Sequence, residues 1–159
     1  MKFNSALRNF VLVLFSTLLI SACSTAKKAS VDTVDDVYTG TDTVEYLAKG
    51  VPDRVFFATN KSKLTTRSRD TLRKQASWLR KNKDVTVTVE GHADERGTRE
   101  YNLAVGERRA NAAKDYLMTY GISGKRISVI SYGKEKPVNP ASSPLAWSQN
   151  RRSVTVKAN

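Results

Sequence analysis

The hydrophobic period of the chain changes within residues 85–120, and this change constrains the fold more than any other feature. Val85-Thr86-Val87-Thr88-Val89 alternates with period two, which predicts a strand with valines on one face and threonines on the other. After a charged loop, apolar residues recur at helical spacing, and Gly121 then supplies a C-terminal stop. The residues of this apolar face are Leu103, Ala110, Ala113, Leu117 and Tyr120. A strand followed by an amphipathic helix predicts an α/β domain.

The remaining segments extend this pattern on both sides. In chain order they are a strand at 55–58, a helix from a cap at Thr65 or Thr66 to about Lys81, a strand at 127–131, a Pro- and Ser-containing loop at 133–148, and a strand at 154–156. Leu72, Ala76 and Leu79 are spaced to face inward from the first helix. The order β-α-β-α-β-β predicts a two-layer α/β sandwich, a mixed four-stranded sheet with helices packed on one face.

The N-terminus has the layout of an export signal. Lys2 and Arg8 precede an apolar run at residues 10–20. This run is too short to span a bilayer but suits a signal peptide. Ile20-Ser21-Ala22-Cys23 resembles a lipobox, which implies cleavage after Ala22 and lipid attachment to Cys23. Ser24 follows, where an Asp would favour the inner membrane, so we expect the outer membrane. The alternative is an ordinary signal peptide with an incidental cysteine.

The sequence divides into a signal peptide at 1–22, a lipidated Cys23 with a flexible tether at 23–50, and a domain at 51–159. The tether is expected because residues 24–50 have no sustained apolar period. A disordered leader without a mechanical role is the alternative. Cys23 is the single cysteine of the chain, so no intramolecular disulfide is expected.

The chain is strongly basic, with a formal net charge of +12. Removal of residues 1–22 takes away two basic residues and leaves +10 (25 Lys and Arg against 15 Asp and Glu). Basic charge predicts a polyanionic partner, and nucleic acid is the usual first candidate. Export to the envelope and the lack of a recognition motif argue against nucleic acid, and leave the cell wall and the lipid surface.

Asp94 and Arg109 form the candidate ligand site. One lies in the charged loop after the period-two strand and the other in the following helix, so the chain brings an anion and a cation together. Such a pair suits a zwitterionic ligand, because a guanidinium can hold a carboxylate through two parallel hydrogen bonds. The alternative is that Asp94 and Arg109 simply bridge each other at the surface.

A set of ordered motifs resembles the peptidoglycan-associated lipoproteins of the OmpA C-terminal-like family. They are Gly91-His92-Ala93-Asp94-Glu95-Arg96-Gly97-Thr98, Tyr101-Asn102-Leu103, Gly106-Glu107-Arg108-Arg109-Ala110, Ser131-Tyr132-Gly133-Lys134-Glu135-Lys136-Pro137 and Asn150-Arg151-Arg152. The resemblance covers about Val55 to Val156. It implies an OmpA-like fold and non-covalent, non-enzymatic binding of peptidoglycan through the diaminopimelate of the stem peptide, with no cofactor.

The same resemblance implies roles and partners. Asp94 would take the ammonium of diaminopimelate and Arg109 its carboxylate, while Arg96, Asn102 and Leu103 would also contact the stem peptide. The implied partners are TolB and other Tol components. One departure is Ala58-Thr59-Asn60, which stands where related sequences usually carry acidic residues.

Other functional interpretations are weaker. A generic OmpA-like wall lipoprotein outside the Tol system is the main alternative, and an envelope hydrolase using Glu90, Asp94 or Glu95 is the alternative from another class. His92, the sole histidine, is expected in a structural turn rather than at a metal. Trp147 is expected in the core or at a rim.

Overall fold

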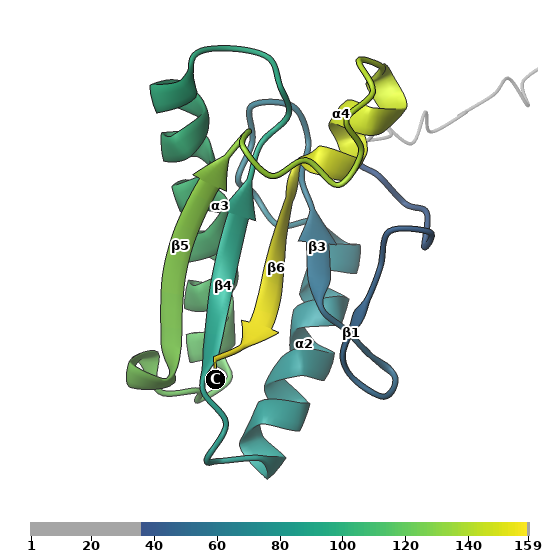
Figure 1. The fold of residues 1–159 in the computed structure, drawn as a ribbon. Coiled ribbons are helices and arrows are strands. Elements are labelled where there is room, and N and C mark those ends of the chain that lie inside the picture. Colours follow the sequence, from purple (N-terminus) through teal and green to yellow (C-terminus); the bar gives the residue numbers. More distant parts are fainter. Residues whose placement is uncertain (1–35, 159) are drawn as a thin grey trace, which may run out of the picture. The chain divides into compact units, whose positions relative to one another are not determined.

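The period-two segment forms a central strand of the sheet. The computed structural model describes residues 36–158, so the signal sequence, Cys23 and the first part of the expected tether lie outside it. The four strands of the sheet are β3 (Arg54–Phe56), β4 (Val87–His92), β5 (Ile127–Gly133) and β6 (Arg152–Lys157). They lie in the order β3-β6-β4-β5, with β4 and β5 parallel and β6 antiparallel to both β3 and β4 (Figure 1). The predicted mixed four-stranded sheet is confirmed.

Two long helices cover one face of this sheet. They are α2 (Thr66–Lys81) and α3 (Arg99–Thr119), which lie behind the strands in Figure 1. The predicted cap of the first helix is Thr65, whose hydroxyl accepts a hydrogen bond from the Ser68 N–H at 3.1 Å. The predicted inward-facing residues of α2 are fully buried among the valines of β4, which face the helices. The two-layer architecture is therefore confirmed.

A pair of glycines lets α3 lie directly on β4. A Cβ on Gly91 would come within 1.8 Å of the carbonyl oxygen of Gly106, and one on Gly106 would come within 2.3 Å of the Ser131 hydroxyl. Gly91 does not have a positive φ, so what it permits is the close approach of two backbones rather than a tight turn. Gly97 does occupy the left-handed region, with φ +93°, in the loop after β4.

A third helix, α4 (Pro144–Asn150), lies within the segment expected to be a loop. The Ser143 hydroxyl caps it by accepting a hydrogen bond from the Ala146 N–H at 3.2 Å, and Pro144 occupies the first turn. The helix is short, and it lies at the end of the sheet rather than across its face (Figure 1). A single 3-10 turn, η1 (Gly124–Arg126), precedes β5.

The domain starts earlier than the expected boundary at residue 51. Residues 36–50 include β1 (Tyr46–Ala48), which pairs antiparallel with β2 (Val51–Pro52). Leu47 is buried in the main core, and the buried Tyr38 ring packs edge-on against Phe56 with centroids 4.8 Å apart. These contacts make residues 36–50 part of the domain rather than of a flexible tether.

Among residues 36–158, no helix combines the length and the apolar composition that a bilayer crossing requires.

Candidate functional site

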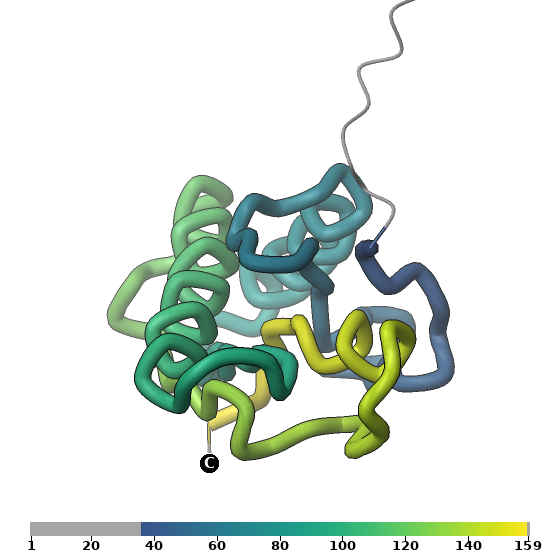
Figure 2. The backbone as a smooth tube through the Cα atoms, turned by 90° about the horizontal axis from the view of Figure 1, so that it is seen from above, coloured from purple at the N-terminus to yellow at the C-terminus, as the bar shows by residue number. Residues whose placement is uncertain are grey.

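The predicted site residues gather at one end of the sheet. Strands β3 and β4 both end there and β6 begins there, because β6 runs antiparallel to both. The end-on view in Figure 2 shows α4 lying between the loop after β4 and the segment that begins at residue 36. Residues that are far apart in the sequence therefore surround one small region.

Asp94 is held from two sides at this end. Its carboxylate accepts hydrogen bonds from Arg96 Nη2 at 2.8 Å and from the Arg96 backbone N–H at 3.1 Å, and Arg151 Nη1 approaches it at 3.3 Å. Burial alone would raise the pKa of Asp94, but the bonds from Arg96 and Arg151 outweigh burial and lower it. The side chain is only 9% exposed. Asp94 is thus a fixed anion that two arginines share.

Arg109 lies beneath the surface, in the buried face of α3. Its guanidinium donates to three backbone carbonyls: Nη1 to His92 O at 2.8 Å, Nε to Lys61 O at 3.0 Å and Nη2 to Ala58 O at 3.2 Å. Burial, followed by the positive charge of Arg151, lowers the pKa of Arg109 to about 10, so it remains cationic at neutral pH. Arg109 ties the ends of β3 and β4 to α3.

The surface salt bridge between Asp94 and Arg109, the alternative to a ligand site, does not form. The Asp94 carboxylate pairs with Arg96 and Arg151, and the Arg109 guanidinium bonds to backbone carbonyls. The two charges remain close enough for Asp94 to favour the charged form of Arg109.

Arg96 is the accessible member of the predicted set. Its side chain is 42% exposed, and its guanidinium lies 4.3 Å from the centre of the Trp147 ring. Trp147 Nε1 in turn donates to Glu95 at 2.8 Å. Trp147 is therefore a rim aromatic, one of the two positions that the sequence suggested.

Asn102 and Leu103 lie in the first turns of α3 and help to shape the loop. Asn102 is buried, and its Nδ2 donates to the Arg96 carbonyl at 2.9 Å. The Leu103 carbonyl accepts a hydrogen bond from the Ser131 hydroxyl at 2.7 Å. Asn102 thus braces the loop that carries Asp94 and Arg96, whereas Leu103 ties the start of α3 to β5.

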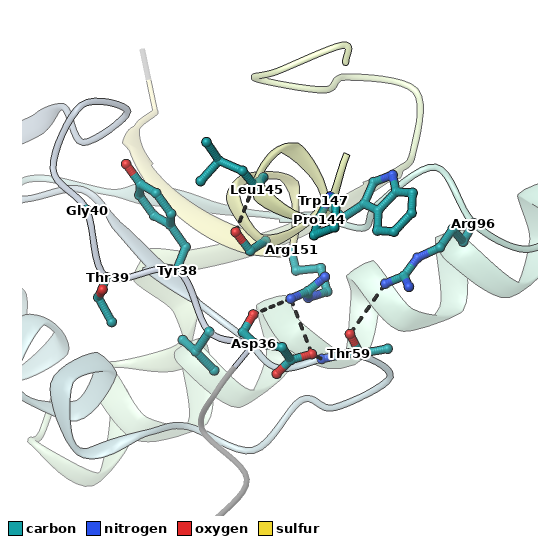
Figure 3. A pocket seen from close by; sticks show the side chains of 12 residues that line it. Asp36, Tyr38, Thr39, Gly40, Thr59, Arg96, Pro144, Leu145, Trp147 and Arg151 are labelled. Carbon is teal, nitrogen blue, oxygen red and sulfur yellow. Dashed lines mark hydrogen bonds and ion pairs between the residues drawn. The ribbon is translucent and has the colours of Figure 1, made fainter. Parts of the chain in front are cut away.

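A cavity of about 500 Å³ opens beside these residues (Figure 3). Its wall includes the side chains of Asp36, Tyr38, Thr59, Arg96, Trp147 and Arg151. Its size is within the range of small-ligand sites. Of the residues predicted for the ligand site, Arg96 lines this cavity, whereas Asp94 and Arg109 lie behind its wall.

Sequence reasoning missed Asp36, because that residue falls in the expected tether. The Thr59 N–H donates to Asp36 Oδ2 at 2.6 Å, and Arg151 Nη2 lies 3.3 Å from the same oxygen. The nearby Tyr38 was the available signal, because a large aromatic residue in a polar segment suggests an anchoring contact. Arg151 braces the site, because its guanidinium lies 3.3 Å from both the Asp36 and the Asp94 carboxylates.

His92 does not take part in a metal site within the described chain. Among residues 36–158, no cluster of three or more His, Cys, Asp and Glu side chains is placed to hold a metal ion. His92 is buried against Tyr132, with ring centroids 5.6 Å apart. Burial and the positive charges of Arg152 and Lys136 lower its pKa to about 3, so the ring is neutral at physiological pH.

Comparisons with known proteins give one consistent result. The profile of the OmpA family matches residues 56–151. A peptidoglycan-associated lipoprotein of Rhizobium meliloti (strain 1021) is 55% identical over 106 residues, which cover 67% of this chain and 60% of that protein. A peptidoglycan-associated lipoprotein of Mesorhizobium japonicum is 42% identical over 154 residues, which cover 94% of this chain and 92% of that protein.

A solved structure agrees with the sequence relatives. The crystal structure of the peptidoglycan-associated lipoprotein from Burkholderia pseudomallei superimposes with a TM-score of 0.65 at 33% identity, covering 67% of this chain and 90% of that chain.

Proposed function

The chain belongs to the OmpA family, among the peptidoglycan-associated lipoproteins, and from this premise we propose that it links the outer membrane to peptidoglycan without cleaving it. The observation that carries the proposal is the similarity to a peptidoglycan-associated lipoprotein over nearly the whole chain. In this proposal, lipid on Cys23 holds one end in the outer membrane, and the domain binds the wall from the periplasm. More than one acyl chain gives the stable anchoring that this requires.

The ligand in this proposal is the diaminopimelate of the stem peptide. Its free end carries an ammonium and a carboxylate on one carbon, so it needs an acceptor and a two-pronged donor close together. Asp94 takes the ammonium and Arg109 the carboxylate, while Arg96, Asn102 and Leu103 contact the rest of the peptide. On binding, some of the hydrogen bonds between Asp94 and Arg96, and between Arg109 and backbone carbonyls, are replaced by bonds to the ligand. This exchange limits the net free energy of binding.

This site also accounts for specificity among walls. A stem peptide with lysine in place of diaminopimelate lacks the second carboxylate. Binding such a peptide would exclude water from the Arg109 guanidinium without supplying a carboxylate to replace that water, which disfavours binding.

A hydrolytic function is disfavoured by the state of the carboxylates. Hydrolysis of a glycosidic bond needs a carboxyl that can donate a proton, and the pKa of such a group is raised. The pKa of Asp94 is lowered, and the Glu95 carboxylate accepts hydrogen bonds from Trp147 and Ser142, which lower its pKa. Release of muropeptides from sacculi by the purified protein would support the hydrolase instead.

We further propose that the protein acts with the Tol system, through TolB. This step rests on the resemblance of the sequence to the lipoproteins of that system, and co-purification with TolB in mild detergent tests it. Wall binding without TolB binding would instead favour a generic OmpA-like anchor.

Sedimentation with purified sacculi tests the wall-binding site. Asp94→Asn and Arg109→Lys should each lower the affinity for diaminopimelate-containing sacculi about 10-fold or more. The first change removes a charged acceptor, and the second keeps the charge but loses the two-pronged donor. Arg108→Ala is the matched control, because Arg108 precedes Arg109 on α3 and faces solvent. It should bind like the wild type, and circular dichroism should show that all variants are folded. Wild-type binding by both Asp94→Asn and Arg109→Lys would overturn the assignment.

A further inference from the structure

We propose that Asp36 is a ligand-binding residue, whose carboxylate accepts hydrogen bonds from the ammonium of the zwitterionic ligand in the cavity of Figure 3. Asp36 lies before the region that matches the OmpA family, which begins at residue 56. The inference rests on the proposed function, because it takes the free end of diaminopimelate as the ligand. It adds a residue to that site from outside the family region.

Asp36 and Asp94 flank the same guanidinium. Arg151 Nη2 lies 3.3 Å from Asp36 Oδ2, and Arg151 Nη1 lies 3.3 Å from Asp94 Oδ2. The two carboxylates differ in access, because the Asp36 side chain is 41% exposed and that of Asp94 is 9% exposed. Asp36 is therefore the carboxylate that a ligand entering the cavity meets first.

An ammonium group needs more than one acceptor. It carries three N–H donors, and each donor that lacks a partner in a closed site weakens binding. Asp94 already accepts hydrogen bonds from Arg96 and Arg151, which reduces what it can offer. Asp36, on the other side of Arg151, supplies the additional acceptor.

Thr59 places Asp36 beside the exposed cation of the cavity. Its backbone N–H donates to Asp36 Oδ2 at 2.6 Å, and its hydroxyl accepts from Arg96 Nη2 at 3.3 Å. One residue thus holds an exposed carboxylate and an exposed guanidinium, as Figure 3 shows. A zwitterionic ligand that enters the cavity can therefore place its ammonium at Asp36, while Arg96 contacts the adjoining part of the stem peptide.

The charge of Asp36 is secured by the same contacts. Burial alone would raise its pKa, but the hydrogen bonds from Thr59 and the charge of Arg151 outweigh burial and lower it. Asp36 is therefore an anion across the physiological range, as an ammonium acceptor must be.

The test pairs one variant with two ligands. We would measure binding of N-acetyl-L-alanyl-γ-D-glutamyl-meso-diaminopimelate, whose one free amine is that of the diaminopimelate side chain, to full-length protein in detergent. The measurement is repeated by competition with the same peptide acetylated on that amine as well. Asp36→Asn should weaken binding of the free-amine peptide about 10-fold, the loss expected for one charge-assisted hydrogen bond. It should leave binding of the acetylated peptide unchanged, because that ligand has no ammonium.

Asp42→Asn is the matched control. It makes the same chemical change in the same segment, at a carboxylate that accepts a hydrogen bond from Gln149 at 3.1 Å and is not part of the cavity wall. It should bind both peptides like the wild type, and thermal unfolding should show that Asp36→Asn and Asp42→Asn are folded.

Two results would overturn the inference. Unchanged affinity of Asp36→Asn for the free-amine peptide would show that Asp36 does not contact the ligand. An equal loss for both peptides would show that Asp36 acts only by holding Arg151. Failure of the proposed function looks different, because the wild type itself would then bind neither the peptide nor sacculi.

Discussion

Several arginines of this chain bond to backbone carbonyls inside the domain instead of facing solvent. Arg109 bonds to the ends of β3 and β4, and Arg151 Nε donates to the Phe57 carbonyl at 3.1 Å. These cations stabilise the protein itself, so they are not available to attract a polyanion. A high net charge is therefore a poor guide to a nucleic-acid partner here.

At the residue scale, the sequence predicted the position of the site better than its contacts. The positions of Asp94 and Arg109 in the sequence predicted that the two residues lie close together, and both do lie at one end of the sheet. The sequence could not show that Arg109 is only 1% exposed. Its partners are backbone carbonyls, which every residue has, so no residue type marks them. Asp36 was missed for a similar reason, since its partner is the backbone N–H of Thr59.

His92 makes stability depend on pH. Its pKa is about 3 in the folded protein and near 6.5 when unfolded, so below pH 6.5 the unfolded chain binds a proton that the folded chain does not. The free energy of unfolding is therefore highest above pH 6.5 and falls as the pH is lowered. We expect a loss of about 2 kcal/mol between pH 7 and pH 5.

Urea unfolding at a series of pH values checks this prediction. His92→Leu should abolish most of the slope between pH 7 and pH 5, because His92 is the only histidine. Asp36 and Asp94, with their lowered pKa values, contribute only at lower pH. A variant that keeps the wild-type slope would contradict the assignment.

At the scale of elements, the long periodic segments were predicted, whereas the short elements β1, β2 and α4 were not. α3 and β4 have enough residues for their periods to be visible. In contrast, β1 and β2 have three and two residues, too few to show alternation. The seven residues of α4 did carry a Ser cap and an early Pro, but the Pro and Ser content of the surrounding segment favoured a loop.

Arg126 fixes the end of α2 and the turn that follows it. Its guanidinium donates to the carbonyls of Leu79, Asn82 and Val85, at distances from 2.6 to 3.2 Å. Arg126→Lys keeps the charge but loses the planar fork that serves several carbonyls at once. We expect it to lower the free energy of unfolding by about 2 kcal/mol.

Thermal and urea unfolding of the variant measure this effect. Lys125→Ala is the control, because that neighbouring side chain is exposed, and it should change stability little. Equal stability of Arg126→Lys and the wild type would show that the hydrogen bonds of Arg126 contribute nothing net.

At the scale of the whole molecule, the proposed function needs two attachments that can be separated. Cys23→Ser removes the proposed lipid site without changing the domain. The variant should leave the outer-membrane fraction, prepared after the wall has been digested, yet should sediment with purified sacculi as the wild type does. Membrane fractionation and sacculus sedimentation of the same samples measure the two attachments. Retention of Cys23→Ser in the digested membranes would contradict lipid anchoring at that residue.

Residues 36–40 enter the domain along the wall of the cavity, next to Arg151. Under the proposed function, a pull from the membrane reaches the domain at Asp36, and the wall pulls on the ligand in the same cavity. Because Asp36 and Arg151 both line that cavity and lie 3.3 Å apart, the two forces meet across a few side chains. The domain can then transmit tension between the two layers without stretching its hydrophobic core.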